Sequence, residues 1–161
     1  MKFHYYDANC LVKLVIKESG SNELQQSFED LESVAITTSF CFYEALGVLK
    51  TKWSRQNRTD AISQKDYLTA SAELCALIEG GNIQLEEFSF YDYESFRQSR
   101  KITEQHGIDL SDSFQLITLK KGMMAGLKTS IIPQLITEDK GIKLAVEELG
   151  LSVLRIDELN V

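Results

Sequence analysis

The chain has 161 residues, of which 43% are hydrophobic and 25% charged, and its net charge is −7. This length fits a single domain, residues 1–161, whose core needs no disulfides, and the acidity excludes a protein that holds nucleic acid by bulk electrostatics alone. No apolar run approaches the roughly 20 residues that span a bilayer. We expect a cytoplasmic protein without a membrane segment or export signal, whose cysteines, Cys10, Cys41 and Cys75, are reduced thiols that fill the core.

Runs of apolar residues predict five strands separated by helices. The expected strands are residues 3–6, 34–37, 83–88, 135–137 and 151–156. The expected helices are residues 9–17, 22–31, 39 into the fifties, 60–79, 91–106, 111–124 and 140–149. Either Ser21 or Asn22, then Ser39, and then either Thr59 or Asp60 are predicted N-caps. Because the strands are almost continuously apolar and alternate with helices, the pattern indicates an α/β fold, with three α/β/α layers around a central, mostly parallel five-stranded sheet.

Four acidic residues stand where an ionised carboxylate is costly unless a cation meets it. Asp7 and Asp139 follow predicted strands, whereas Glu44 and Asp112 lie near the starts of predicted helices, in apolar surroundings. A buried, unpaired carboxylate costs on the order of several kcal/mol. Sites in parallel α/β sheets form beyond the carboxyl ends of the strands. We therefore expect the four acids to share one site at that edge.

Carboxylates without histidine or cysteine partners suit a hard cation, Mg²⁺ or Mn²⁺. Such ions polarise a phosphodiester, supply a hydroxide nucleophile and stabilise the leaving oxygen, so the expected reaction is phosphodiester hydrolysis. Thr137 and Ser39 are candidates to orient a water or a ligating carboxylate, and Asn9 is a candidate to reach a substrate phosphate. Asp109, three residues before Asp112, is a further candidate ligand.

The ordered motifs also resemble a known family. Residues 6–14, Tyr-Asp-Ala-Asn-Cys-Leu-Val-Lys-Leu, look like the opening motif of PIN-domain nucleases, the fold of VapC-type toxins. The helix with Glu44 is similar to the second motif of the family. Residues 108–114 are similar to the third motif, and the strand-Thr-x-Asp pattern at 135–139 is similar to the fourth. Residues 122–133 form a longer link than is usual between the last two motifs.

This resemblance implies a Mg²⁺- or Mn²⁺-dependent endoribonuclease that acts on RNA, often as the toxin of a toxin–antitoxin pair. It also implies an antitoxin protein that covers the active site, and a homodimer. The residues implied to be catalytic and metal-binding are Asp7, Glu44, Asp112 and Asp139.

One stretch of the acidic chain is basic. Residues 50–65 carry five basic side chains against one acid, a local charge of +4, with Trp53 in the middle. Such a stretch favours contact with an RNA backbone, but a solvated helix end whose cations meet the C-terminal dipole explains it equally well. The candidate RNA-contacting residues are Lys50, Lys52, Arg55 and Arg58.

Other interpretations of the acids remain open. An aspartate after a strand is commonly an N-cap, which is a sufficient explanation for Asp7, Asp112 or Asp139 taken singly. A PIN-like protein-interaction module without catalysis would keep the same acids. A receiver-like phospho-acceptor domain ranks lower, because Asp7 has no acidic neighbour in sequence. Neither histidine lies near a nucleophile pattern, so the sequence does not favour a Ser–His or Cys–His triad.

Overall fold

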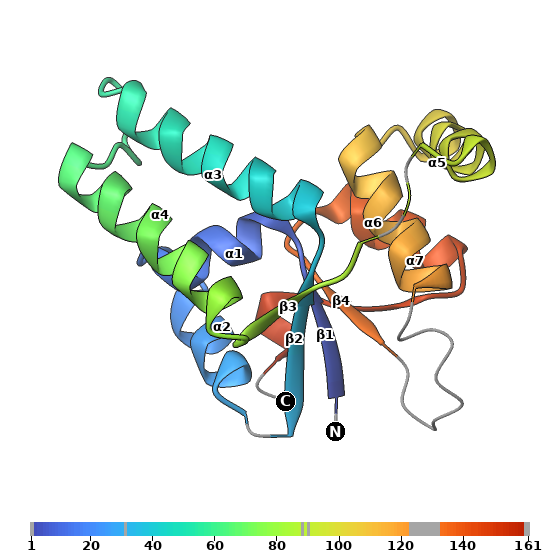
Figure 1. The fold of residues 1–161 in the computed structure, drawn as a ribbon, viewed down its shortest axis with the longest axis horizontal. Coiled ribbons are helices and arrows are strands. Elements are labelled where there is room, and N and C mark those ends of the chain that lie inside the picture. The colour runs from blue at the N-terminus through green and yellow to red at the C-terminus, as the bar shows by residue number, and fades with distance from the viewer. Residues whose placement is uncertain (1, 31, 88, 90, 123–132, 160–161) are drawn as a thin grey trace.

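The structure is a computed structural model that describes residues 2–30, 32–87, 89, 91–122 and 133–159. Within these residues the centre is a sheet of five parallel strands in the order β3-β2-β1-β4-β5 (Figure 1). The strands are β1 (Lys2–Tyr6), β2 (Ser33–Thr37), β3 (Ile83–Leu85), β4 (Gln134–Ile136) and β5 (Ser152–Leu154). The predicted five-stranded sheet is therefore confirmed, and every described strand pair is parallel.

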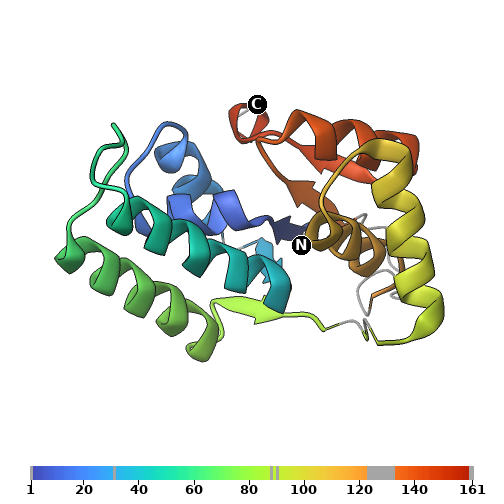
Figure 2. The same ribbon diagram turned by 90° about the horizontal axis from the view of Figure 1, so that it is seen from above.

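Helices cover both faces of this sheet. They are α1 (Ala8–Val15), α2 (Ser21–Phe28), α3 (Ser39–Ser54), α4 (Gln64–Glu79), α5 (Tyr93–His106), α6 (Leu110–Lys121) and α7 (Lys140–Glu148), followed by the 3-10 turn η1 (Ile156–Glu158). Seen from above, α1 to α4 lie on one side and α5 to α7 on the other (Figure 2). This arrangement confirms the predicted three-layer α/β/α fold.

The two helical layers pack on alternate side chains of the same strands, because successive residues of a strand point to opposite faces. Tyr6 of β1 and Ile136 of β4 belong to the apolar cluster beneath α1 to α4. Tyr5 and Leu135, one residue earlier on each strand, belong to the cluster beneath α5 to α7. All four side chains are fully buried. Apolar side chains therefore pack on both faces of β1 and β4. This packing fixes the strand ends that are followed by Asp7 and Asp139.

Three helices have N-caps other than those predicted. Ser63, and neither Thr59 nor Asp60, caps α4, because Ser63 and Asp66 form a reciprocal capping box. The N-cap of α3 is Thr38 in place of Ser39, and its Oγ1 accepts a hydrogen bond of 3.2 Å from the backbone N–H of Cys41. The predicted capping of α2 by a serine or asparagine is also wrong, since Gly20 occupies that position with φ +83°.

Three other predictions concern the end of α6, the burial of the cysteines and membrane-spanning helices. Helix α6 ends at Lys121, and the predicted continuation to 124, with most of the long link 122–133, lies outside the described residues. Cys10 and Cys41 are buried, as predicted, but Cys75 is exposed on α4, where it fills no core. None of the described helices combines the length and apolar character needed to cross a bilayer.

Candidate metal centre

Asp7 is the buried member of the four acids. It follows β1 and caps α1, where its Oδ1 accepts a hydrogen bond of 2.7 Å from the backbone N–H of Cys10. Its Oδ2 accepts a hydrogen bond from the Thr137 hydroxyl. Burial raises the pKa of Asp7, and the hydrogen bonds from Thr137 and Cys10 oppose that rise. Both oxygens of this carboxylate are therefore held in place.

The backbone just before Asp7 is also fixed. The carbonyl oxygen of Tyr6 accepts hydrogen bonds from the Thr37 hydroxyl at 2.9 Å and from the Gln115 amide at 3.2 Å. Thr37 ends β2 and Gln115 lies in α6, and both side chains are buried. The turn that presents Asp7 is thus tied to the neighbouring strand β2 and to the helix α6.

Thr137 connects the first acid to the last. Its hydroxyl donates to Asp7 and accepts a hydrogen bond of 3.0 Å from the backbone N–H of Asp139. Asp139 caps α7, where its Oδ1 accepts from the backbone N–H groups of Gly141, at 2.6 Å, and Ile142, at 3.0 Å. The carboxylate of Asp7 and the start of α7 therefore belong to one hydrogen-bonded chain.

Glu44 and Asp112 come together because α3 packs against α6. Phe40 in the first turn of α3 stacks on Phe114 of α6, with ring centroids 5.4 Å apart and planes within 5° of parallel. A hydrogen bond with Ser111 of α6 reaches the Glu44 carboxylate. Asp109 occupies the N-cap position of α6, but its side chain makes no capping hydrogen bond within the described helix.

These acids act on one another electrostatically. Burial raises the pKa of Asp112 to about 7, and the negative charges of four neighbouring carboxylates add to the rise. Burial also raises the pKa of Glu44, with contributions from Asp109 and Asp7, while the Ser111 hydrogen bond lowers it. We call the five residues the acidic cluster: Asp7, Glu44, Asp109, Asp112 and Asp139.

The burial of the four predicted acids is not uniform. Asp7 is 3% exposed and Asp112 is half-buried, whereas Glu44 and Asp139 are exposed. The expectation that Glu44 lies in apolar surroundings is wrong, because its neighbour Tyr43 is itself 79% exposed and only one face of α3 reaches the core. Capping explains Asp7 and Asp139 locally. It does not explain Glu44 or Asp112, because Thr38 and Asp109 occupy those N-cap positions.

The donors of the acidic cluster fit a hard divalent cation. All five side chains offer carboxylate oxygens, and a cation would offset the repulsion that raises the pKa of Glu44 and Asp112. Within the described residues, however, no group of three Asp, Glu, His or Cys side chains is arranged to hold one ion. Metal binding therefore requires these side chains to approach one another more closely.

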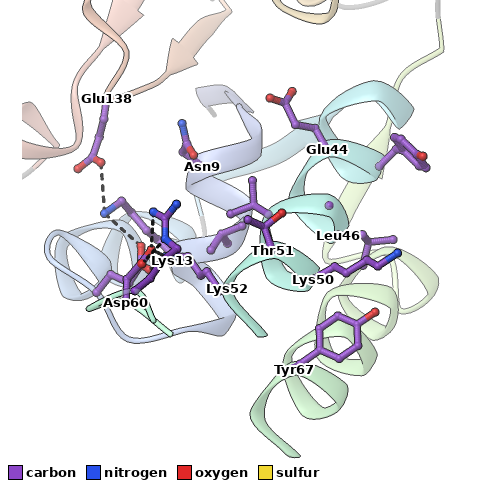
Figure 3. A pocket seen from close by; sticks show the side chains of 16 residues that line it. Asn9, Lys13, Glu44, Leu46, Lys50, Thr51, Lys52, Asp60, Tyr67 and Glu138 are labelled. Carbon is purple, nitrogen blue, oxygen red and sulfur yellow. Dashed lines mark hydrogen bonds and ion pairs between the residues drawn. The ribbon is translucent and has the colours of Figure 1, made fainter. Parts of the chain in front are cut away.

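A cleft of about 890 Å³ adjoins the acidic cluster on the α1, α3 and α4 side (Figure 3). Asn9 and Glu44 lie near each other on its wall, and Lys50 and Tyr67 lie farther along it. Asn9 is exposed, so its amide is accessible from the cleft. The cleft thus runs from one acid of the cluster toward the predicted basic stretch.

No protein-family model and no curated protein matches the sequence. Solved structures do match. PAE2754 from Pyrobaculum aerophilum has a TM-score of 0.60 and 14% identity, covering 98% of this chain and 86% of that one. FitAB bound to an IR36 DNA fragment has a TM-score of 0.55 and 14% identity, covering 95% and 94%. FitAcB from Neisseria gonorrhoeae has a TM-score of 0.53 and 14% identity, covering 95% and 97%.

The chain has a PIN-like fold. At 14% identity the likeness concerns the fold alone. The likeness extends over 95–98% of this chain and 86–97% of the matched chains.

On this PIN-like fold, two of the five cations of residues 50–65 are engaged in ion pairs. Lys52 is buried, and its Nζ lies 2.6 Å from Glu18 and 2.7 Å from Asp60. The Arg58 guanidinium lies 2.7 Å from the same Asp60 carboxylate. Because carboxylates already pair with Lys52 and Arg58, these two side chains are poor candidates to contact an RNA backbone.

The other cations of residues 50–65 are open to solvent. Lys50 and Arg55 are exposed, and Lys50 lines the cleft. Trp53 stacks on Tyr67 with ring centroids 4.9 Å apart, so it joins α3 to α4. Trp53 therefore has a packing role.

Among the predicted accessory residues, Ser39 makes its hydrogen bond outside the acidic cluster. Its hydroxyl donates a hydrogen bond of 3.0 Å to Glu87, in the segment after β3. Sequence reasoning did not single out Gln115, which holds the backbone before Asp7, or Lys13, which is buried beside the segment that carries Asp139. A lone lysine inside the apolar run 11–16 was the available signal for Lys13.

Proposed function

We propose that this protein is a Mg²⁺- or Mn²⁺-dependent endoribonuclease, acting as the toxin of a toxin–antitoxin pair. The observation that carries the proposal is the convergence of four acids at the carboxyl edge of a parallel PIN-like sheet, two from strand ends and two from helix starts. The order of the sequence motifs supports the same activity through their resemblance to PIN-domain nucleases.

In this proposal Asp7, Glu44, Asp112 and Asp139 hold the cation, and Asp109 stands beside them. The bound cation would polarise the scissile phosphate and lower the pKa of a water. Asp7 presents fixed oxygens, since Cys10 and Thr137 hold them. Burial and the neighbouring carboxylates raise the pKa of Asp112 to about 7 in the absence of a cation, so binding of a cation would lower this pKa and release protons near neutral pH.

The cleft beside the cluster is the proposed path of the RNA. Asn9 would contact a phosphate next to the acids, and Lys50 and Arg55 would contact the backbone farther along α3. With a net charge of −7 and three exposed cations outside the ion pairs of residues 50–65, namely Lys50, Arg55 and Lys65, non-specific binding should be weak and sensitive to salt.

Replacing Lys50 by alanine is expected to weaken RNA binding without changing the chemical step. One phosphate contact is lost, so the slope of log K against log salt should fall by about one, and KM should rise while kcat stays constant. Lys101 is an exposed lysine on α5, away from the cleft, and Lys101→Ala is the matched control. Equal effects of the two substitutions would remove Lys50 from the proposed path.

The proposed activity is tested by incubating the full chain with labelled single-stranded and structured RNAs in Mg²⁺, Mn²⁺ or EDTA. We expect cleavage in either metal and none in EDTA. The alternative is a catalytically silent PIN-like interaction module, which is favoured by the lack of a preformed three-donor group among the described residues. Cleavage in no metal, together with tight binding to the product of an adjacent gene, would support that module and contradict the nuclease.

A further inference from the structure

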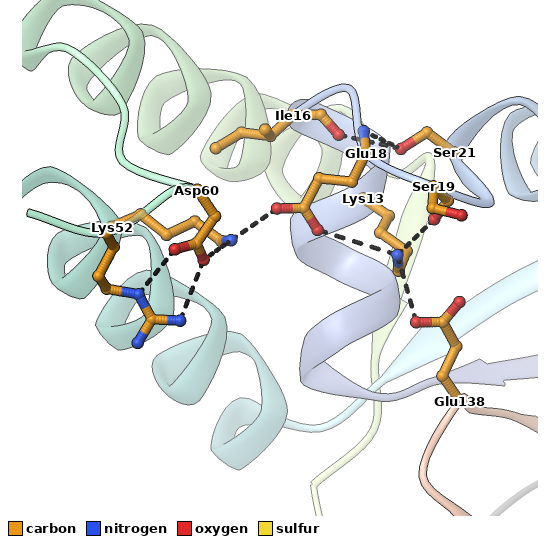
Figure 4. A network of polar contacts seen from close by, with 9 residues as sticks. Lys13, Ile16, Glu18, Ser19, Ser21, Lys52, Asp60 and Glu138 are labelled. Atoms are coloured by element: carbon orange, nitrogen blue, oxygen red, sulfur yellow. Dashed lines mark hydrogen bonds and ion pairs between the residues drawn. The ribbon is translucent and has the colours of Figure 1, made fainter.

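A network of ion pairs lines the cleft that Glu44 of the acidic cluster also lines, and Figure 4 shows the members of this network. Two buried lysines share its central carboxylate: Lys52 of α3 lies 2.6 Å from Glu18, and Lys13 of α1 lies 3.8 Å from it. Each lysine also has a second acidic partner. Lys52 pairs with Asp60 at 2.7 Å, and Lys13 pairs with Glu138 at 3.2 Å. The network therefore has an outer arm toward Asp60 and an inner arm toward Glu138.

Burial of the Lys13 ammonium group costs free energy unless the group is paired. Lys13 is 8% exposed within the apolar helix α1, and a buried ammonium needs charged or hydrogen-bonding partners. Its Nζ has three of them, the carboxylates of Glu18 and Glu138 and the backbone carbonyl of Ser19, to which it donates a hydrogen bond. These partners come from the segment between α1 and α2 and from the segment between β4 and α7, so the ammonium ties the two segments together.

Glu138 is the partner nearest to the proposed metal site. It stands between Thr137, which donates to Asp7, and Asp139, which caps α7. The Gly20 turn packs closely beside it, because a Cβ on Gly20 would lie 3.3 Å from Glu138 Oε1 and 3.0 Å from the side chain of Ile156. Lys13 and this turn thus hold the segment 137–139 from outside.

Resting on the proposed function, we infer that Lys13 is a positioning residue of the acidic cluster. Through Glu138 it fixes the segment that presents Thr137 and Asp139 to Asp7. Without Lys13, the segment would keep its strand and helix neighbours but lose the ion pair that sets the segment's position relative to α1. The effect on cation binding would then resemble loss of an outer-sphere partner, about 10–100-fold in metal affinity.

Lys52 offers a matched control. It is also a lysine, it has the same 8% exposure, and it shares Glu18 with Lys13, but its other partner is Asp60. Lys52→Met breaks the outer arm of the network and leaves the pair of Lys13 with Glu138 intact. A general loss of stability is therefore expected from both substitutions, whereas a local effect at segment 137–139 is expected only from Lys13→Met.

The first readout uses the metal-free full chain. Amide hydrogen exchange is measured for Asp139, Gly141 and Ile142, whose N–H groups bond to Thr137 or to the Asp139 side chain, with the amide of Ile36 in β2 as the global reference. Lys13→Met should speed exchange at the three amides by about 10-fold or more relative to the reference. Glu138→Ala leaves Lys13 its contacts with Glu18 and Ser19, and it should also speed exchange at the three amides. This variant replaces Lys13→Met as the test if Lys13→Met does not fold. Lys52→Met should leave the ratio unchanged.

The second readout is the Mn²⁺ affinity, expected to fall about 10–100-fold in Lys13→Met but not in Lys52→Met. Equal exchange ratios in Lys13→Met and Lys52→Met, or no change in Lys13→Met and Glu138→Ala, would overturn the inference. Absence of Mn²⁺ binding by the wild-type chain would instead overturn the proposed function. The exchange measurement separates the two failures, because it contains no metal.

Discussion

Asp7→Asn is expected to lower RNA cleavage by about 10²–10⁴-fold while the protein stays folded. A cation at a reacting phosphate contributes several kcal/mol of transition-state stabilisation, and an amide in place of the central carboxylate would lose most of it. The fold should tolerate the change. The Asn carbonyl can accept from the Cys10 N–H, and its NH₂ can donate to Thr137 Oγ1, replacing the two hydrogen bonds of Asp7.

The same substitution should leave the metal-free protein as stable as the wild type or more stable. Burial raises the pKa of Asp7, so the ionised carboxylate opposes folding at neutral pH, and a neutral amide removes that opposition. Asp7→Ala is the control, since it also loses the N-cap of α1 and should destabilise by about 1 kcal/mol. Cleavage by Asp7→Asn at the wild-type rate, in a folded protein, would contradict the proposed activity.

The second large effect is expected on stability. In the absence of divalent metal, Asp112→Asn should stabilise the protein at pH 7.5 by about 1–2 kcal/mol, or roughly 2–8 °C in Tm. The folded-state pKa of Asp112 is raised from 3.8 to about 7, by burial first and then by four neighbouring carboxylates. Solvent screening of this half-buried group keeps the effect below the full value of the shift.

The sign of the pH dependence follows from the direction of the shift. Between about pH 4 and pH 7 the folded state binds more protons at Asp112 than the unfolded state, so the free energy of unfolding falls as pH rises. The gain from Asp112→Asn should therefore vanish below about pH 4 and be complete above pH 7. Saturating Mg²⁺ should reverse the order, because the cation binds the ionised cluster of the wild type.

Denaturant unfolding of both proteins from pH 4 to pH 8, with and without Mg²⁺, checks this prediction. Glu73→Gln on α4 is the control, because Glu73 is an exposed acid outside the cluster. The structure indicates that the carboxylates of the acidic cluster repel one another. A wild-type protein whose stability does not change between pH 4 and pH 7, with no gain from Asp112→Asn, would contradict this.

Local sequence pattern was sufficient for the architecture of this chain. Short apolar runs such as residues 3–6 are typical of buried strands, and interleaved helices favour a parallel sheet, so the carboxyl edge and the acids that follow β1 and β4 were predictable. Asp7 and Asp139 are found there. Helix starts were less predictable, because a cap depends on one hydrogen bond that several neighbouring serines, threonines and aspartates compete to make.

Contacts between residues far apart in the chain could not be predicted from the sequence. Glu44 lies among apolar residues in the chain, but its exposure depends on which face of α3 meets the core, and that is set by tertiary packing. Likewise the +4 stretch gave no sign that Glu18, more than thirty residues away, would pair with Lys52. The pair of Lys13 with Glu138 joins α1 to the β4–α7 segment in the same way.

A crystal structure of the protein soaked in Mn²⁺, with the anomalous signal of the metal recorded, tests the central claim most directly. We predict an anomalous peak in contact with Asp7 and with at least one of Glu44, Asp112 and Asp139, with these side chains drawn closer together than in the metal-free structure. A Mn²⁺ ion that contacts none of the four acids would contradict the proposed metal centre.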